Sequence, residues 1–277
     1  MNLPAATQSL KLAVYQYSAR DETPDQRLQR LDDILRAAKD APFDLVVCPE
    51  LFLSGYNVGR RLADLSQTQQ GSFAVSAAEI ARNHRTALVY GYPETAGGQL
   101  YNSAIAVDSS GRQLANHRKL RIPNGFERDW FTSGGNYTML EIAGFSIALL
   151  ICYDVEFPES VRTCALAGAD LIVAPTALRA EWSFVARQLI PARAFENGVF
   201  LAYANYCGEE NGFVYLGESC IIGPDGREIA RAGADETLLT AVLKREEVAR
   251  ARERLPYLEH RGDLDRVAIG GRSAPRS

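Results

Sequence analysis

The sequence places a thiol, a carboxylate and an ammonium group at or beyond the ends of strand-like segments. The apolar run 145–151 gives way to Cys152 and then to a turn and a helix start. Glu50 closes a second strand-like run, and Lys119 lies just beyond a third, residues 101–107. A helix start offers free N–H groups and a positive dipole end, which favour a thiolate. A nucleophile, a base and a cation are therefore available for covalent catalysis.

Short apolar runs alternate with helical patterns along the chain, which predicts an α/β fold. Pro191 should kink or interrupt the last predicted helix. The predicted strands cover residues 10–17, 44–50, 87–93, 101–107, 145–151, 170–175, 199–204 and 218–222, and the last two are expected to complete the sheets. The predicted helices cover residues 28–38, 73–84, 158–167 and 183–197.

Length and composition fit one large domain. The chain has 277 residues, of which 47% are hydrophobic, enough for a sizeable core. Because no Ser/Pro-rich or charged linker divides it, we predict a single domain over residues 1–277, with a core from about residue 10 to 245 and a C-terminal extension. The last ten or so residues are polar and Gly-rich, and are expected to be frayed.

Charge and motifs exclude several classes of function. A net charge of −4 without a long basic run gives no footprint for nucleic acid. The N-terminal residues lack a basic region leading into a long apolar stretch, which predicts a cytoplasmic protein without a membrane partner. Five cysteines without a Cys-x-x-Cys pair fit neither a disulfide framework nor a zinc site. No glycine-rich phosphate or dinucleotide motif is present, so we expect no cofactor and no metal.

Glu50, Lys119 and Cys152, in this order, resemble the Glu-Lys-Cys triad of the nitrilase superfamily of carbon-nitrogen hydrolases. The resemblance runs from about the first strand to Ala230. The resemblance implies a four-layer αββα sandwich, in which two mixed sheets pack face to face between helix layers. It also implies a homo-oligomer, a dimer or larger. Further similar segments are residues 90–94, 101–104, 192–197 and 221–226.

The residues after the cysteine indicate the branch of the superfamily. Residues 152–159 are more similar to amidases than to true nitrilases. Residues 53–57 and 202–208 resemble the bacterial amidases that hydrolyse 5-aminopentanamide and the R-stereoselective amidases, whereas the loop 120–125 departs from the former. The expected reaction is hydrolysis of a small aliphatic carboxamide, with an ω-amino amide as one candidate. Hydrolysis of an N-carbamoyl amine or a nitrile by the same triad stays an alternative.

The resemblance implies a role for each member of the triad. Glu50 takes the proton of Cys152, returns it to the leaving nitrogen and later activates water. Lys119 and the backbone N–H of Tyr153 hold the oxyanion of the tetrahedral intermediate. The family carries a second glutamate after the lysine, and Glu127 matches it, with a role in positioning substrate and Lys119.

The acyl side of the substrate should meet residues that follow strand ends or lie beside the triad. Glu156 is a candidate partner for a substrate ammonium group. It could instead be a carboxylate that stabilises a helix start, and Trp182 could simply pack at one. The predicted pocket residues are Tyr56, Phe126, Tyr153, Glu156, Ala177 and Trp182.

Two rival hypotheses follow from the same residues. In the first, His117 or His84 acts as the base for Cys152, as in Cys-His hydrolases. In the second, the chain is a binding module that keeps the scaffold without catalysis, against which the complete triad argues. Cys48 and Cys220 are expected to be core residues of strands, Cys164 to lie on a helix, and Cys207 to be a loop residue without a role.

Overall fold

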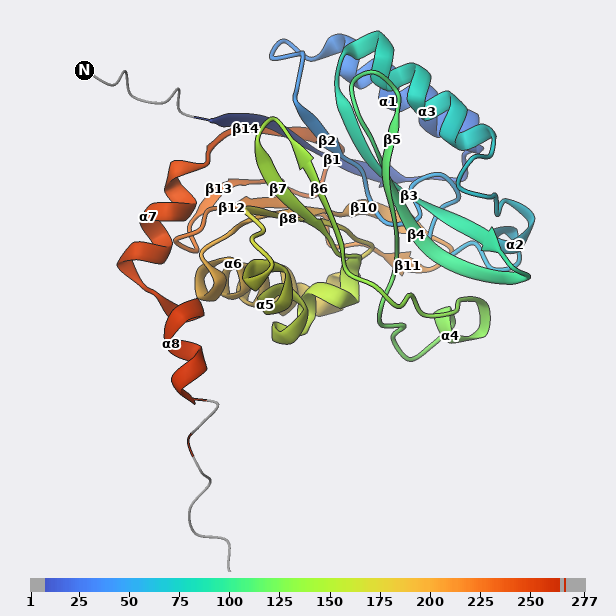
Figure 1. The fold of residues 1–277 in the computed structure, drawn as a ribbon. Helices are drawn as coiled ribbons and strands as arrows, with labels where there is room; N and C mark the ends of the chain where they lie inside the picture. Colours follow the sequence, from blue (N-terminus) through green and yellow to red (C-terminus); the bar gives the residue numbers. More distant parts are fainter. Residues whose placement is uncertain (1–7, 265–266, 268–277) are drawn as a thin grey trace, which may run out of the picture.

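The computed structural model describes residues 8–264 and 267 of the chain. Within these residues the strands form two sheets that pack face to face, one of eight strands and one of six (Figure 1). The larger sheet has the order β11-β10-β1-β2-β3-β4-β5, with β14 also paired to β1. The smaller sheet has the order β13-β12-β9-β8-β7-β6. The last residues, 268–277, which the sequence predicts to be frayed, lie outside the described residues.

The strands of the larger sheet are β1 (Ser9–Ala19), β2 (Leu45–Val47), β3 (Ala87–Ala96), β4 (Gln99–Val107), β5 (Gln113–Arg118), β10 (Tyr206–Glu210), β11 (Phe213–Val214) and β14 (Thr237–Lys244). Those of the smaller sheet are β6 (Thr138–Ile142), β7 (Phe145–Leu149), β8 (Leu171–Pro175), β9 (Phe200–Ala204), β12 (Cys220–Ile222) and β13 (Glu228–Arg231). Both sheets mix parallel and antiparallel pairs.

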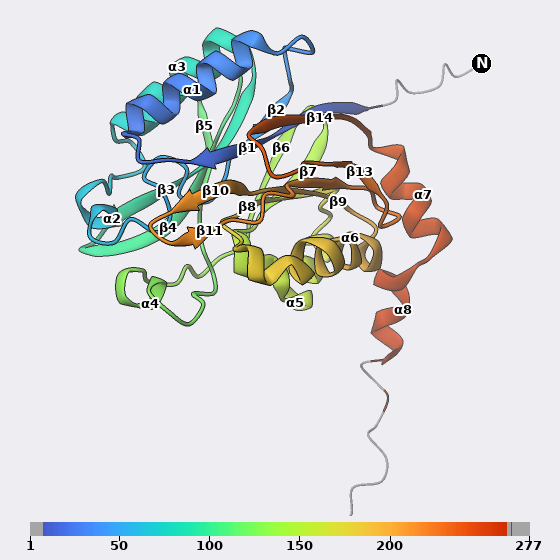
Figure 2. The ribbon, with the colours of Figure 1, turned by 180° about the vertical axis from the view of Figure 1, so that it is seen from behind.

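The helices cover the outer faces of the two sheets (Figure 2). α1 and α3 lie on the larger sheet, and α5 and α6 on the smaller one. No helix in the described part of the chain is long and apolar enough to cross a membrane. The helices are α1 (Pro24–Ala37), α2 (Arg61–Asp64), α3 (Ser72–His84), α4 (Glu127–Trp130), α5 (Pro158–Leu166), α6 (Ile190–Asn197), α7 (Glu246–Arg254) and α8 (Tyr257–Leu264).

Three hydrophobic clusters join these layers, one between each neighbouring pair. The period-two alternation of β1 divides its side chains between two of them. Tyr15 and Tyr17 face the cluster beneath α1 and α3, whereas Leu12 and Val14 face the cluster between the sheets. The third cluster lies between the smaller sheet and its helices and contains Ile172 and Ile190. The predicted αββα sandwich is therefore confirmed.

Local sequence signals set several boundaries. Thr23 caps α1 through a capping box with Gln26, and Pro24 occupies its first turn. The interruption expected at Pro191 is present, because a π-helical turn over Val185–Leu189 precedes α6.

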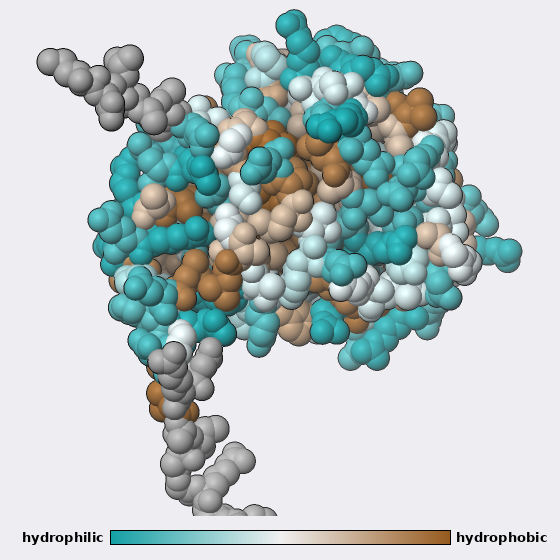
Figure 3. Space-filling view, viewed as in Figure 1, coloured by the Kyte–Doolittle hydropathy of each residue, from teal (hydrophilic) through white to brown (hydrophobic). Residues whose placement is uncertain are grey.

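The face seen in Figure 1 is mostly hydrophilic, and its hydrophobic residues gather near β6 and β7, where the edges of the sheets lie (Figure 3).

Three sequence predictions about the sheets were wrong. The strand expected at 44–50 ends at Val47, so Glu50 lies in the turn beyond it. The sheets are not completed by the strands near 199–204 and 218–222, because β5, β6, β10, β11, β13 and β14 were missed. β14 is a half-exposed edge strand whose apolar residues are interrupted by Thr240. Cys207 is a buried residue of β10 rather than a loop residue.

Candidate active site

Cys152 stands directly beyond β7, where a short 3-10 helix over Cys152–Glu156 begins. Its backbone has φ of +45°, a left-handed conformation that non-glycine residues rarely adopt. The side chain is buried, and the residue is 7% exposed. The backbone N–H of Ala177, beyond β8, faces the sulfur and lowers the pKa of the thiol. The ends of two neighbouring parallel strands thus fix the thiol.

The expectation that the helix start favours a thiolate is wrong for this site. Burial and the nearby Glu50 carboxylate raise the pKa of the Cys152 thiol well above its ordinary value. Lys119 and the N–H of Ala177 lower the pKa without offsetting this rise. A five-residue 3-10 helix brings too small a dipole to prevail. The resting thiol is therefore protonated and needs a base.

Glu50 lies in the turn after β2, and its carboxylate is fully buried. Its Oε1 accepts hydrogen bonds from Lys119 Nζ at 2.6 Å and from Asn102 Nδ2 at 2.7 Å. Among the residues that the structure describes, its Oε2 has no hydrogen-bond partner. Burial raises the pKa of Glu50 to about 7, since Lys119 lowers it while Glu127 raises it. A carboxyl group with this pKa can both accept and return a proton near neutral pH.

A close approach between two backbones places this turn. A Cβ atom at Gly91 of β3 would lie 2.2 Å from the backbone nitrogen of Leu51. Gly91 also donates its N–H to the carbonyl of Pro49 at 3.3 Å and accepts from Leu53 N at 3.1 Å. Only glycine leaves room for this contact. The tyrosine hydroxyl of Tyr206 further holds the turn by donating to the carbonyl of Glu50 at 2.8 Å.

Lys119 follows β5 directly, and its side chain is fully buried between two carboxylates. Its Nζ lies 2.6 Å from Glu50 Oε1 and 2.8 and 2.9 Å from the two oxygens of Glu127. Burial lowers the pKa of the ammonium group, but Glu127 and Glu50 outweigh burial and hold this pKa well above its ordinary value. The lysine is therefore a fixed cation rather than a proton carrier.

Glu127 opens α4 and is buried. Besides Lys119, it accepts hydrogen bonds from Tyr56 Oη at 2.6 Å and from Asn102 Nδ2 at 3.2 Å. Glu50, Lys119 and Glu127 form one buried cluster of charges, which Asn102 bridges. We call these four residues the charge cluster.

A pocket of about 570 Å³ opens onto the thiol and is lined mainly by apolar side chains. All six predicted pocket residues line it, together with Cys152 and Glu127, whereas Glu50 and Lys119 lie buried behind it. Trp182 is 58% exposed, as expected of a residue at a rim. The other lining residues are Asn57, Pro123, Asn124, Gly125, Leu178, Arg179, Val185 and Phe213.

Glu156 is the acidic residue of this pocket apart from the charge cluster. Burial raises its pKa to about 7, while Lys119 and Arg193 lower it. Arg193 donates from Nη2 to the backbone carbonyl of Glu156 at 2.8 Å. Its carboxylate makes no hydrogen bond within the described residues and lines the pocket, where a ligand could contact it.

The histidines of the rival hypothesis bind other partners. His117 Nδ1 lies 3.0 Å from Thr138 Oγ1, and its Nε2 lies 3.6 Å from Asp154 Oδ2. His84 Nε2 lies 2.7 Å from Asp32 Oδ1, on α1. Both histidines are thus bound by residues other than Cys152.

Sequence reasoning missed two residues of the site. Asn102 bridges Glu50 and Glu127, and Asp154 binds backbone N–H groups on both sides of the site. Both lie inside the similar segments at 101–104 and 152–159, so a polar residue buried within a motif was the signal that could have found them. Within residues 8–264 and 267, no group of three or more His, Cys, Asp or Glu is arranged to hold a metal ion.

Comparison with known proteins decides the family. The family model described as carbon-nitrogen hydrolase matches residues 11–253. The chain belongs to the carbon-nitrogen hydrolase family. This confirms the predicted superfamily, and the relatives below confirm its amidase branch and the predicted enzyme class.

Two curated relatives and one solved structure are similar over most of this carbon-nitrogen hydrolase. A Pseudomonas protegens protein named "Hydrolase in pqqF 5'region" is 42% identical, over 93% of this chain and 90% of its own length. An (R)-stereoselective amidase from a Pseudomonas species is 32% identical, over 91% of each. The amidase from Nesterenkonia sp. AN1 is 34% identical with a TM-score of 0.83, over 95% of this chain and 98% of that chain.

Variants of the Nesterenkonia amidase have been solved with small ligands. One shows covalent addition of the acetamide moiety of fluoroacetamide at the active-site cysteine. Others hold acrylamide or butyramide. These ligands are those of the Nesterenkonia enzyme.

Proposed function

We propose that this carbon-nitrogen hydrolase cleaves a small aliphatic carboxamide to the carboxylic acid and ammonia through a thioester on Cys152. One observation carries the proposal. A protonated thiol in an apolar pocket lies beside a buried carboxylate of pKa about 7 that has one oxygen without a partner. That carboxylate is also paired with a fixed cation. These are the parts that acyl transfer from an amide requires.

In the acylation step, Cys152 Sγ attacks the amide carbonyl while its proton passes to Glu50 Oε2. The carbonyl π electrons move to oxygen, and the resulting oxyanion is held by Lys119 and the backbone N–H of Tyr153. When the tetrahedral intermediate collapses, the C–N bond breaks and Glu50 gives the proton to the leaving nitrogen. Ammonia departs, and the acyl group remains on sulfur.

In the deacylation step, a water molecule attacks the thioester carbonyl. Glu50 takes one proton of the water, and the same donors hold the second oxyanion. Collapse breaks the C–S bond, and the proton returns from Glu50 to the sulfur. The acid leaves, so the sum is amide plus water to acid plus ammonia, with the enzyme unchanged.

Glu127 supports this sequence by holding Lys119 in place. The nearly equal distances of 2.8 and 2.9 Å fit one ammonium proton shared between its two oxygens. A second proton faces Glu50, which leaves the third for the substrate oxyanion. Without Glu127, the ammonium group would be free to settle against Glu50 alone.

The substrate we favour carries a cationic group at the far end of a short apolar chain, as 5-aminopentanamide does. Phe126, Val185 and Phe213 supply apolar walls for the chain, and Glu156 supplies a carboxylate for the ammonium group. Contact with a cation would return the pKa of Glu156 toward its ordinary value, so that binding and ionisation support each other.

The test is ammonia release by the purified enzyme from matched substrates. 5-Aminopentanamide, pentanamide, an N-carbamoyl amine and a nitrile form the panel, with Cys152→Ala as the control. Amide turnover that Cys152→Ala abolishes supports the mechanism, and a preference for 5-aminopentanamide over pentanamide supports the substrate class. Turnover of the N-carbamoyl amine or the nitrile alone would overturn the amide assignment.

Single-domain organisation, homo-oligomeric assembly and a cytoplasmic location stay predictions.

A further inference from the structure

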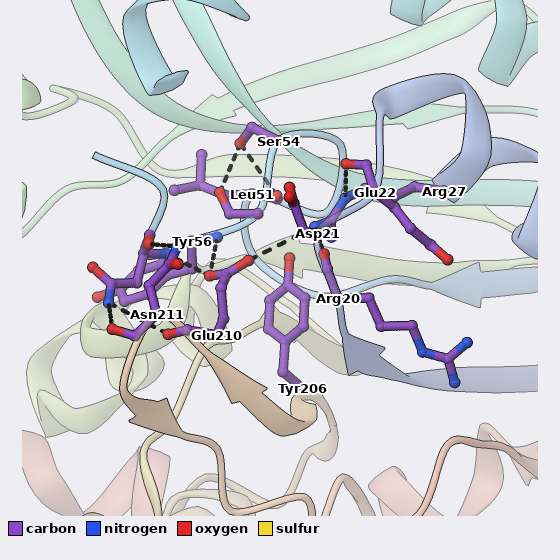
Figure 4. Close-up of polar contacts among 12 residues, drawn as sticks. Arg20, Asp21, Glu22, Arg27, Leu51, Ser54, Tyr56, Tyr206, Glu210 and Asn211 are labelled. Carbon is purple, nitrogen blue, oxygen red and sulfur yellow. Dashed lines mark hydrogen bonds and ion pairs between the residues drawn. The ribbon is translucent and has the colours of Figure 1, made fainter. Parts of the chain in front are cut away.

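A second buried ion pair, between Arg27 and Glu210, lies next to the backbone of the pocket residue Tyr56 (Figure 4). Glu210, the last residue of β10, has a side chain that is 5% exposed. Arg27, in the first turns of α1, has one that is 1% exposed, and its Nη2 lies 3.7 Å from Glu210 Oε1. Burying two charges costs several kcal/mol unless further hydrogen bonds satisfy them. The pair therefore has to be explained by what it holds.

Glu210 holds the backbone at the pocket wall. Its Oε2 accepts hydrogen bonds from the backbone nitrogens of Tyr56 at 3.0 Å and Asn57 at 2.6 Å, and from Tyr215 Oη at 2.9 Å. Gly55 makes room for this carboxylate, because a Cβ atom there would lie 2.4 Å from Glu210 Oε1. Gly55 also has φ of +87°, which glycine adopts freely.

Arg27 fixes Glu210 and the surrounding turns. Its guanidinium group donates to the carbonyls of Arg20 at 2.7 Å, Glu22 at 3.3 Å and Phe52 at 3.3 Å. The guanidinium group thereby joins the end of β1, the start of α1 and the turn after β2. The carboxylate it faces is therefore anchored to the turns that follow β1 and β2 and to the residues that lead into α1.

Tyr56 carries this anchoring to the charge cluster. Its backbone N–H is bound by Glu210, and its hydroxyl donates to Glu127 Oε1 at 2.6 Å. Glu127 in turn holds Lys119. One residue thus links the buried ion pair to the carboxylate that orients the proposed oxyanion donor.

We propose that Glu210 is a positioning residue of the amidase reaction, which fixes the backbone at Tyr56 so that the tyrosine hydroxyl holds Glu127 against Lys119. This rests on the proposed roles of Lys119 and Glu127. Glu210 does not touch the substrate, and its effect on turnover passes through the Tyr56 hydroxyl. Removing that hydroxyl should therefore remove the effect.

The experiment is a double-mutant cycle between Glu210→Gln and Tyr56→Phe. The readouts are kcat on the best amide of the panel and the rate at which iodoacetamide alkylates Cys152, both corrected for the folded fraction. In the wild-type background, Glu210→Gln should lower both by about tenfold, the size of one hydrogen bond to a charged group. In the Tyr56→Phe background it should lower them by less than about twofold. Glu209→Gln, an exposed neighbour on the same strand, is the matched control and should leave both unchanged.

Equal losses in both backgrounds would overturn the proposal, since a purely structural role would not depend on the Tyr56 hydroxyl. Should Glu210→Gln not fold, Tyr215→Phe removes one donor to the same carboxylate and enters the same cycle. The alkylation rate does not depend on the substrate assignment. An enzyme that turns over no amide but shows the coupling in alkylation would contradict the proposed function and support the positioning role.

Discussion

The carboxylate of Asp154 accepts a hydrogen bond from the backbone N–H of Arg121 at 2.8 Å. Its two oxygens also accept from Leu120 N, at 3.1 Å each, and from Ile151 N at 3.2 Å. Asp154 thus ties the segment after Lys119 to the turn that carries the nucleophile.

Replacing Asp154 by Asn should weaken this tie. An amide that presents its NH₂ group leaves backbone N–H groups without an acceptor, at a cost of about 1–3 kcal/mol. We expect a lower melting temperature and a lower kcat per folded enzyme. Thermal unfolding and ammonia release measure the two, and Asp64→Asn, at an exposed position on α2, serves as the control. An unchanged kcat would show that the tie matters for folding alone.

Replacing Lys119 by Met should abolish most turnover and destabilise the fold. Loss of an oxyanion donor costs about 10²–10³ in kcat. The unpaired Glu50 and Glu127 carboxylates should cost about 3–5 kcal/mol of unfolding free energy. Adding Glu127→Gln removes one of these charges, so the double variant should be more stable than Lys119→Met and equally inactive. Urea denaturation compares them, and a double variant of lower stability would contradict the buried pairing.

The dependence of kcat/KM on pH should follow the ionisation of Glu50. The base works as the carboxylate, so kcat/KM for an uncharged amide should rise with pH through about 7 and then level off. Lys119 should cause no fall on the alkaline side below about pH 10, because its pKa is held above the ordinary 10.5. Initial rates from pH 5 to 10 on pentanamide give the profile. A midpoint near 4.5 would mean that burial does not raise the pKa of this carboxyl.

The preference for a cationic over an uncharged amide should change with pH as Glu156 ionises. The ratio of kcat/KM for 5-aminopentanamide to that for pentanamide cancels the titration of Glu50, which both substrates share. As Glu156 loses its proton near pH 7, the ratio should increase. In Glu156→Gln it should be low and independent of pH. A ratio that is the same in both enzymes would remove Glu156 as the ammonium partner.

His117→Gln tests the rival base. The histidine is buried against Thr138 and Asp154, so the variant should be less stable. Its kcat per folded enzyme should stay within about tenfold of the wild type, because the histidine takes no proton in the mechanism. Loss of all turnover in a folded protein, with Glu50→Gln still active, would favour the Cys-His mechanism.

Much of the site could be predicted because its residues sit at strand ends within short motifs. Cys152, Glu50 and Lys119 were found in this way, and the six pocket residues all line one cavity. The ionisation of Cys152 could not be predicted, since it depends on burial and on a carboxylate about a hundred positions earlier in the chain. The Glu210 ion pair was missed for the same reason, because nothing near residue 210 in the sequence points to Tyr56.

The edge of the larger sheet was also beyond the sequence patterns. β14 lies against β1 although more than two hundred residues separate them, and its half-exposed face carries no strong periodic signal. The order of the strands along the chain does not indicate that β14 pairs with β1. By contrast, α3 and α5 were predicted almost to their ends.

The thiol and the charge cluster come from different sheets. Cys152 and Ala177 follow β7 and β8 of the smaller sheet, whereas Lys119 follows β5 and Glu50 follows β2 of the larger one. The apolar layer between the sheets, together with the hydrogen bonds of Asp154, fixes the distance between the reacting groups. Activity therefore depends on how the larger sheet packs against the smaller one. A small shift of one sheet relative to the other would separate the reacting groups and abolish activity while both sheets stayed folded. Activity should therefore be lost at a lower temperature than secondary structure.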